Sequence, residues 1–210
     1  NDAIEDLKLV LKSIGEEFGN LILTGFQVNS IYEALLNSWS SQPPNKGLVI
    51  TAQTGAGKTL GFDIPAIVDA LIENRMAIES HRKPGLSQLL LYPRNDLAKD
   101  QRATLESYLG RLNDNLIDAG REQHVVTLAI DAGGLIKSHT EWVPHVRGKK
   151  EIDRIPWGAC KAPKGQTQNV FNSSNEKYAG MGQHGRSANI MIAGIESFRR
   201  RLSNTNVVSA

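Results

Sequence analysis

The residues best suited to chemistry lie in a glycine-rich turn at 52–59, which ends on the pair Lys58 and Thr59. Gly55 and Gly57 allow the backbone to curl so that successive N–H groups point at one centre, where a polyphosphate can lie. Lys58 is a point charge for the β- and γ-phosphates, and the Thr59 hydroxyl is a ligand for Mg²⁺. We therefore predict a site for ATP or GTP with Mg²⁺, formed by Gln53, Thr54, Gly55, Ala56, Gly57, Lys58, Thr59 and Leu60.

The flanking residues predict the elements that such a loop requires. Residues 48–51 are an apolar run that predicts a strand entering the loop, and residues 59–78 predict the helix that leaves it. The dipole of this helix adds to the attraction for an anion. A glycine-rich turn that binds nothing is the alternative, but the strand, the spacing and the Lys-Thr pair together favour a phosphate site.

Predicted helices and strands alternate along the rest of the chain. Apolar residues at helical spacing predict helices at 2–18, 27–39, 94–109, 111–119 and 195–202. Continuous apolar runs predict strands at 88–93, 125–130 and 188–194, of which 88–93 has the character of a strand buried on both faces. This alternation predicts an α/β domain whose parallel sheet is flanked by helices.

The composition favours a cytoplasmic globular protein. The chain has 210 residues and a net charge of +2, which is too small to argue for nucleic acid by itself. Cys160 is the single cysteine, so a reducing compartment is expected. No run approaches the ~20 apolar residues that cross a bilayer, and the first residues do not read as a signal peptide. Because the chain begins at Asn1 rather than methionine, we expect it to be part of a longer protein.

Five stretches follow one another along the chain: Gln27, 52–59, 92–101, the pair Gly133 and Gly134, and 193–199. This ordered set resembles the motifs of the first RecA-like domain of superfamily 2 helicases of the DEAD/DEAH-box type. Phe26 and Gln27 lie upstream of the loop and open a helix, as the Q motif does, and the loop itself resembles motif I. The resemblance implies that ATP binds against Phe26 and Gln27, with the Gln27 side chain reading the adenine edge. For Gln27 taken alone, a surface glutamine is the alternative.

The other motifs resemble those that contact nucleic acid in this family. Residues 92–101 are similar to motif Ia, in the version of large bacterial helicases that reads Tyr-Pro-Arg-Asn-Ala-Leu followed by Asp-Gln. An arginine at a helix start is also suited to a phosphate. Residues 193–198 resemble motif Ib, from which they depart at both threonines and the proline. The resemblance implies contacts to nucleic acid, DNA rather than RNA, by Arg94, Asn95, Gly133, Gly134, Gly194 and Arg199.

Two parts of the family's catalytic unit are not found in the sequence. The acidic Asp-Glu box would follow another apolar strand beyond residue 208, and the second RecA-like domain, with its arginine finger, would follow later. Hydrolysis needs one carboxylate for Mg²⁺ and a second to orient water. Asp131 ends a predicted strand, but read against the family it lies in the wrong slot. We therefore expect an N-terminal helix at 1–20 and, at 21–210, a first RecA-like domain that is incomplete at its C-terminus.

A basic segment without regular periodicity interrupts this domain at 137–186. Nine basic and four acidic residues give it a net charge of +5, and aromatic residues are interleaved with the charges. Its alternative roles are contact with single-stranded nucleic acid, docking onto the missing domains, or a flexible loop. A zinc site that includes Cys160 lacks paired-ligand spacing.

The sequence therefore predicts an ATP-dependent helicase or translocase, represented by its first motor domain, with Lys58 and Thr59 as catalytic residues. Expected partners are nucleic acid, a second RecA-like domain and other subunits of a repair or phage-defence complex (the DISARM type among them), with no membrane. The chain alone is expected to bind ATP and Mg²⁺ without hydrolysing ATP. The alternatives are a self-contained P-loop switch or kinase, with Asp131 as metal ligand, and a nucleotide-binding scaffold that recruits a partner protein.

Overall fold

The computed structural model of the chain describes residues 2–40, 47–82, 84–131, 188–196 and 198–199. The basic segment 137–186, and with it Gly133 and Gly134, lie outside these ranges. Within them the chain forms an α/β fold with four α-helices, one short 3₁₀ helix and a three-stranded sheet. The predicted class, helices packed on a parallel sheet, is confirmed for the described residues.

The sheet is parallel throughout and its strand order is β1-β3-β2. Its strands are β1 (Gln88–Tyr92), β2 (Leu128–Asp131) and β3 (Ile190–Gly194). Tyr92 is in register with Gly194, and Asp131 is in register with Ala193, so the three strands end at one edge of the sheet. Every residue of the central strand β3 is buried. Parallel strands require crossover connections, and helix α4 (Asn95–Asp118) is the crossover between β1 and β2.

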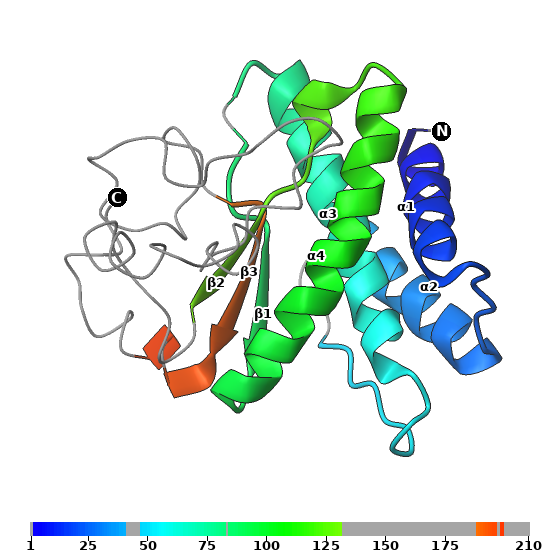
Figure 1. Ribbon diagram of the computed structural model, residues 1–210, viewed down its shortest axis with the longest axis vertical. Helices are drawn as coiled ribbons and strands as arrows, with labels where there is room; N and C mark the ends of the chain where they lie inside the picture. The colour runs from blue at the N-terminus through cyan, green and yellow to red at the C-terminus, as the bar shows by residue number, and fades with distance from the viewer. Residues whose placement is uncertain (1, 41–46, 83, 132–187, 197, 200–210) are drawn as a thin grey trace, which may run out of the picture.

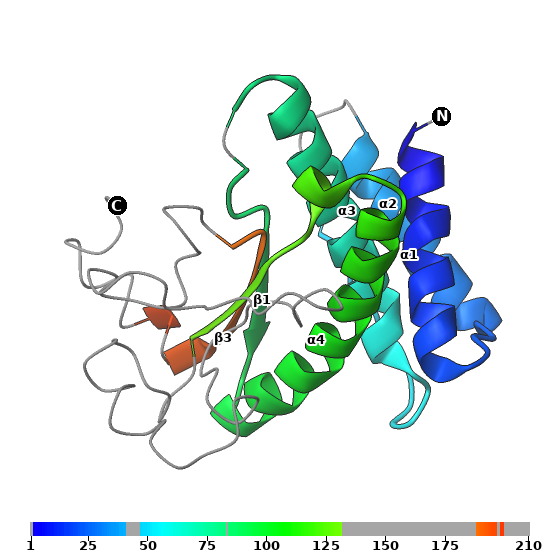
Figure 2. The same ribbon diagram turned by 45° about the horizontal axis from the view of Figure 1, so that its top comes forward.

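The helices lie together on one side of the sheet (Figures 1 and 2). Helix α4 contacts all three strands, and α3 (Lys58–Glu79) contacts β1 and β3. Helix α1 (Asp2–Phe18) packs on α3 and α4, and α2 (Gly25–Trp39) packs on α3. The short 3₁₀ helix η1 (Glu122–His124) leads into β2 and contacts α3 and α4.

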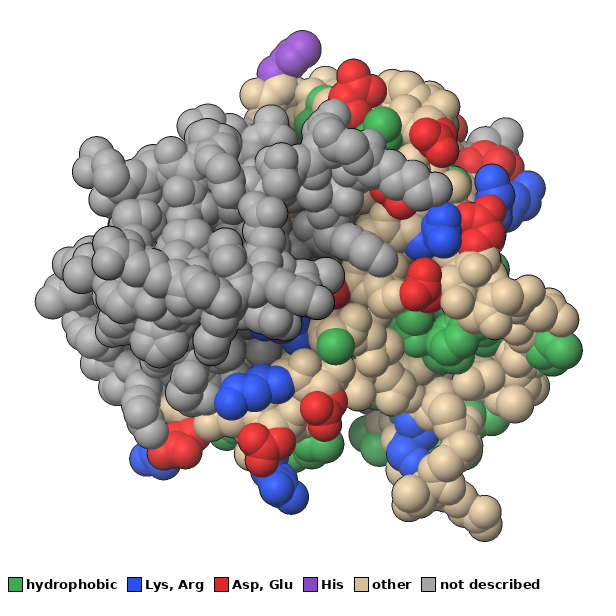
Figure 3. Space-filling view, viewed as in Figure 1, with side chains coloured by type: hydrophobic (Ala, Val, Ile, Leu, Met, Phe, Trp, Pro, Cys, Tyr) green, Lys and Arg blue, Asp and Glu red, His purple; other side chains and the backbone are tan. Residues whose placement is uncertain are grey.

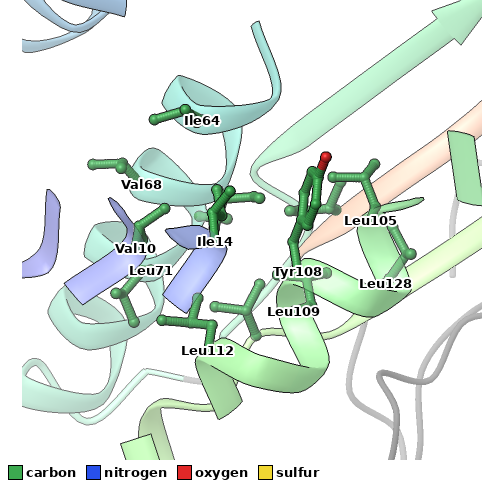
Figure 4. Packing of buried hydrophobic residues seen from close by; sticks show 14 of the residues in the cluster. Val10, Ile14, Ile64, Val68, Leu71, Leu105, Tyr108, Leu109, Leu112 and Leu128 are labelled. Carbon is green, nitrogen blue, oxygen red and sulfur yellow. The ribbon is translucent and has the colours of Figure 1, made fainter. Parts of the chain in front are cut away.

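The core lies where α1, α3, α4 and the sheet meet (Figure 4). Helix α4 contributes four fully buried leucines at spacings of three and four residues, Leu105, Leu109, Leu112 and Leu116. Burying each of them is worth roughly 2 kcal/mol relative to exposure. Their spacing forms one continuous apolar stripe, which explains why α4 is a single helix through Gly110 instead of the two predicted helices at 94–109 and 111–119.

A buried carboxylate attaches α1 to the rest of the fold. Asp6 is 1% exposed and accepts hydrogen bonds from Arg75 Nε at 3.0 Å and from Arg121 Nη2 at 2.8 Å. Arg75 lies on α3 and Arg121 lies just before η1, so one side chain of α1 joins two other parts of the chain. The N-terminal helix is therefore an integral part of the described fold and not a loose appendage.

Two predictions about strands are wrong. Residues 48–51 do not form a strand, and Val49 is 82% exposed. Strand β1 is not buried on both faces, because Leu89 and Leu91 are 37% and 44% exposed while Leu90 and Tyr92 pack against the core. An apolar run is stable as a strand only beside another strand, and among the described residues no strand pairs with 48–51 or with the outer edge of β1.

Candidate nucleotide and nucleic-acid site

The glycine-rich loop has the conformation that its two glycines allow. Gly55 has a φ of +84° and Gly57 has a φ of +71°, and the N–H of Ala56 donates to the Gln53 carbonyl at 3.2 Å. Gly57 is the N-cap of α3 and has no side chain to cap the helix. The first N–H groups of α3 are therefore left for a ligand, as at other helix starts that bind anions.

Lys58 closes the loop on itself. Its ammonium donates to the carbonyl of Ala52 at 2.8 Å and to that of Gln53 at 2.7 Å. These bonds close the backbone at 53–57 into a ring between the Ala52 carbonyl and the Lys58 side chain. Because an ammonium has three N–H donors, one donor remains beyond these two bonds. To reach a phosphate with its full charge, Lys58 would have to exchange these loop carbonyls for phosphate oxygens.

Gln27 connects the start of α2 to this loop. Its side-chain oxygen accepts from the Thr24 backbone N–H at 2.8 Å, while the Thr24 hydroxyl accepts from the Gln27 N–H at 3.3 Å, which together form a capping box. At the other end of the same amide, Nε2 donates to the Gly57 carbonyl at 3.0 Å. Gln27 is 6% exposed. The predicted neighbourhood of Gln27 and the loop is therefore present, with Gln27 directed at the loop backbone.

Close packing of α2 on α3 holds Gln27 in this position. A Cβ added at Gly61 would lie 3.1 Å from the Ser30 Cβ, so the absence of a side chain at Gly61 lets the two helices approach. At the far end of α2, the Ser38 hydroxyl and the Trp39 indole donate to the Asp69 carboxylate at 2.7 and 3.0 Å. These contacts fix α2 relative to the start of α3.

The loop leaves open space beside Gly55. A Cβ at Gly55 would meet no atom within 4 Å, so space as well as backbone freedom is available there. Thr59 follows Lys58 in the first turn of α3, where its side chain is half-buried. The part of the chain that the structure describes holds no group of three acidic, histidine or cysteine residues that could bind a metal. If Thr59 holds Mg²⁺ as predicted, phosphate oxygens and water would be its other ligands, which suits this ion.

The second group of predicted residues lies at the carboxyl edge of the sheet. Arg94 is the N-cap residue of α4, and its exposed guanidinium pairs with Asp96 at 3.5 Å. A Cβ at Gly194 would clash with the Asn95 side-chain oxygen, so the end of β3 and the start of α4 lie close together and a larger residue at 194 would displace the Asn95 side chain. Arg199 is exposed in the helical residues that follow β3. The structure thus brings Arg94, Asn95 and Gly194 together.

Both groups lie at the same end of the molecule. In Figure 1 the arrowheads of the strands, the first turn of α4 and the loop before α3 are all found in the lower part of the view. Figure 3 shows basic and acidic side chains interspersed there, and no continuous basic surface over the described part of this face. A phosphate at this edge would therefore meet single side chains such as Arg94, and not an extended positive surface.

A buried carboxylate beneath this edge was not predicted. Asp63, in the second turn of α3, is 0% exposed, and neither carboxylate oxygen has a hydrogen-bond partner among the described residues. Burial raises the pKa of Asp63 to about 7. The Tyr92 hydroxyl is likewise buried without a partner in the described part, and burial and then the charge of Asp63 raise the pKa of Tyr92. Burial and the charges of Asp63 and Glu17 raise the pKa of Tyr108 to about 12.

The described residues form a parallel α/β fold with a phosphate-loop sequence at the start of a helix. The chain belongs to the DEAD/DEAH box helicase family, whose sequence model matches residues 26–141, just over half of the chain. This match confirms the resemblance on which the motif assignment rests. It also covers both Gln27 and Arg94, which are far apart in sequence.

Curated relatives match over shorter stretches. The Druantia protein DruE of Escherichia coli (strain UMEA 4076-1) is 41% identical over 63 residues, which are 30% of this chain and 3% of that protein. The ATP-dependent RNA helicase dbp7 of Botryotinia fuckeliana is 37% identical over 60 residues, 29% of this chain and 7% of that protein. The ATP-dependent rRNA helicase SPB4 of Vanderwaltozyma polyspora is 32% identical over 72 residues, 34% of this chain and 12% of that protein.

These matches span at most 12% of the length of the three relatives. Comparison with solved structures found no match. Among the described residues, no helix is both long and apolar enough to cross a membrane.

Proposed function

We propose that this chain is the first motor domain of an ATP-dependent nucleic-acid helicase or translocase. One observation carries the proposal: within the matched family region, the phosphate-loop sequence and the strand end that bears Arg94 lie at one end of the fold. ATP bound in the loop and nucleic acid lying across the carboxyl edge of the sheet would then be neighbours. Closure of the domain around ATP could then act directly on the bound strand.

In this proposal the nucleotide lies against Phe26, Gln27 and the loop. Its phosphates accept hydrogen bonds from the N–H groups of residues 53–60 and from the Lys58 ammonium. Thr59 holds Mg²⁺, which neutralises charge on the phosphates when it is bound. Lys58 is then the residue that positions and stabilises the transferring phosphoryl group.

The nucleic-acid backbone would lie against Arg94, Asn95, Gly194 and Arg199, with Gly133 and Gly134 as further contacts. Arg94 is exposed and its partner Asp96 is exposed as well, so a phosphate can replace that ion pair at little cost. We propose DNA as the track, because the motif Ia stretch is of the large bacterial type. Two of the matched relatives are named as RNA helicases, so RNA is the competing track.

The acidic box and the second RecA-like domain would belong to the longer protein. Closure of the two domains on ATP, and reopening after hydrolysis, would move the strand. We further propose a cytoplasmic protein that works with other subunits of a repair or defence complex. The chain alone would bind ATP without turning it over.

The self-contained switch or kinase is the weaker alternative. It needs Asp131 as the metal ligand beside the loop, whereas Asp131 ends the edge strand β2, with β3 between it and β1. Helix α3, which carries Lys58 and Thr59, contacts β1 and β3. The sheet order therefore favours a nucleotide site whose acidic metal ligand comes from residues other than Asp131.

The test is the ATPase rate of the chain, with and without single-stranded DNA, beside the Lys58→Ala variant. We expect measurable ATP binding that Lys58→Ala removes, and no turnover above the rate of that variant. Turnover that disappears with Lys58 would mean that the site is complete within these residues. The domain would then be a self-contained nucleotide hydrolase, and the proposal that it is the first of two motor domains would be wrong.

A further inference from the structure

Four large apolar side chains are exposed along one face of helix α2. Val28 is 48% exposed, Tyr32 60%, Leu36 52% and Trp39 42%. They follow one another at spacings of four, four and three residues, so at about 100° per residue they lie within an arc of roughly 80° around the helix. Figure 3 shows exposed hydrophobic side chains in the region of α2, at the right of the view. We call these four residues the α2 stripe.

The Trp39 end of the stripe is held in place by the chain itself. The Trp39 indole donates to the Asp69 carboxylate at 3.0 Å, and the Ser38 hydroxyl donates to the same carboxylate at 2.7 Å. The polar atom of the Trp39 ring thus has its partner, while part of the ring remains exposed. Tryptophan and tyrosine carry much of the binding energy of protein interfaces, and an ordered ring loses little freedom on binding. The stripe therefore has the character of a protein-binding surface.

Helix α2 carries almost no charge. Glu33 is the single charged residue of its 15, and the helix has no lysine or arginine. Helices that lie on a membrane surface carry Lys and Arg on their polar face, so a lipid surface does not fit α2. Depletion of charge is instead typical of the centre of a protein interface. It also allows two copies of this face to approach each other without the repulsion that like charges cause.

The stripe is complementary in size to a second copy of itself. A two-fold axis near Ala34 would pack two α2 helices antiparallel. Tyr32 of one copy then lies opposite Leu36 of the other, and Val28 of one copy lies near Trp39 of the other. Each aromatic ring meets a smaller aliphatic side chain, which is the alternation of large and small groups that packs well.

The stripe is also large enough for such a dimer. Its four residues expose roughly 400 Å², which is the size of the largest apolar patch on a typical monomer. Because apolar atoms form about 57–65% of an interface, each copy would bury about 600–700 Å² in all. The two copies together would bury about 1,200–1,400 Å², at the lower end of the range for specific interfaces. This area predicts a dissociation constant in the micromolar range.

We propose that the α2 stripe is the interface of a dimer between two copies of this chain, packed antiparallel through α2. The inference does not depend on the proposed motor function. The stripe faces away from α3, whereas the buried side of α2 carries Gln27, which donates to the Gly57 carbonyl of the loop. The dimer therefore leaves Gln27 and the loop outside its interface.

The experiment is analytical ultracentrifugation of the chain at concentrations from about 1 to about 200 µM, which bracket the expected constant. Two variants, Tyr32→Glu and Leu36→Lys, each place a charge on the stripe. Ile4→Lys is the matched control, because Ile4 is 51% exposed on α1 and lies outside the stripe. Thermal unfolding of each variant establishes that it is folded. Should a charged variant fail to fold, Tyr32→Ser and Leu36→Ser remove the apolar contact without adding a charge.

We expect the chain and Ile4→Lys to dimerise with the same micromolar constant, and each stripe variant alone to dimerise about tenfold more weakly or worse. An equal mixture of Tyr32→Glu and Leu36→Lys should form dimers again, because the two-fold packing brings the introduced carboxylate opposite the introduced ammonium. A chain that stays monomeric at the highest concentration would overturn the proposal. A dimer that both stripe variants leave intact would overturn it too, since another surface would then form the interface. Loss of the dimer in each variant without recovery in the mixture would overturn the antiparallel packing, and with it the dimer proposed here.

Discussion

Asp63 is expected to make the stability of the fold depend on pH near neutrality. Its carboxyl is fully buried, and the described residues offer it no hydrogen bond. The pKa in the folded state is about 7, against 3.8 as the ordinary value. The folded state therefore binds the proton more tightly than the unfolded state, and protonation of Asp63 stabilises the fold.

The size of the effect follows from the shift of about three pH units. At about 1.4 kcal/mol per unit, the full difference is roughly 4 kcal/mol. The sign is that of an acid with a raised pKa: the stabilisation is complete below pH 3.8, falls as the pH rises, and is lost above about 7. Between pH 5 and pH 8 the chain should lose roughly 2.5 kcal/mol through this group alone.

Urea unfolding at pH 5, 6, 7 and 8 would measure this loss as a difference between variants. Asp63→Asn removes the titration, so the stability of this variant relative to the unmodified chain should rise by roughly 2.5 kcal/mol across the series. Asp63→Leu should be the more stable variant at pH 8, because it also removes a buried polar group that has no partner. Asp100→Asn, a change at an exposed position of α4, is the matched control and should follow the unmodified chain. Parallel profiles for the chain and Asp63→Asn would refute the reasoning.

Three further predictions concern the attachment of α1 and the edge of the sheet. Asp6→Ala should cost about 3 kcal/mol of unfolding free energy in urea, because two arginines lose their shared carboxylate, Arg121 among them; a cost below about 0.5 kcal/mol would contradict this. Gly194→Ala should place a methyl group against the Asn95 side chain, destabilise the fold by about 1–3 kcal/mol and weaken single-stranded DNA binding. Adding Asn95→Ala to it should restore most of the stability, and no restoration would show that the clash lies elsewhere. Arg94→Ala should weaken DNA binding measured by fluorescence anisotropy and reduce its salt dependence by about one phosphate contact, with unfolding unchanged; an unchanged salt slope would remove Arg94 from the interface.

Much of the fold follows from local pattern, because the signals lie within single elements. Helices α1 and α2 and strands β1 and β3 occur within a few residues of their predicted bounds. The two helices predicted at 94–109 and 111–119 are one helix, α4, because Leu109 and Leu112 continue one apolar stripe across Gly110. Periodicity over the whole stripe outweighs one glycine, which costs a helix only about 1 kcal/mol.

The absence of a strand at 48–51 could not be predicted from these residues themselves. Leu48 and Val49 have strong strand character, yet Val49 is 82% exposed. Whether an apolar run becomes a strand depends on a neighbouring strand to receive its N–H and C=O groups. That neighbour is a long-range property, which a local pattern does not contain.

The candidate site was predicted in part. The family, and with it Gln27, the loop and Arg94, was identified from motif order, and the match at 26–141 confirms the family. Asp63 was missed because an aspartate in the second turn of a helix usually faces solvent. The helical spacing does indicate that Asp63 is buried. Asp63 lies three residues after Leu60 and four before Ile67, and both of these residues are on the face of α3 that packs against the core.

The two bonds from Lys58 to the carbonyls of Ala52 and Gln53 have a consequence for the cycle of a motor. Without them, the loop backbone would keep more of its conformational freedom. With them, the loop has one defined shape that its own lysine holds together. In the proposed motor, phosphate oxygens would replace the two carbonyls as partners of Lys58, so the nucleotide would exchange one ordered arrangement of this side chain for another.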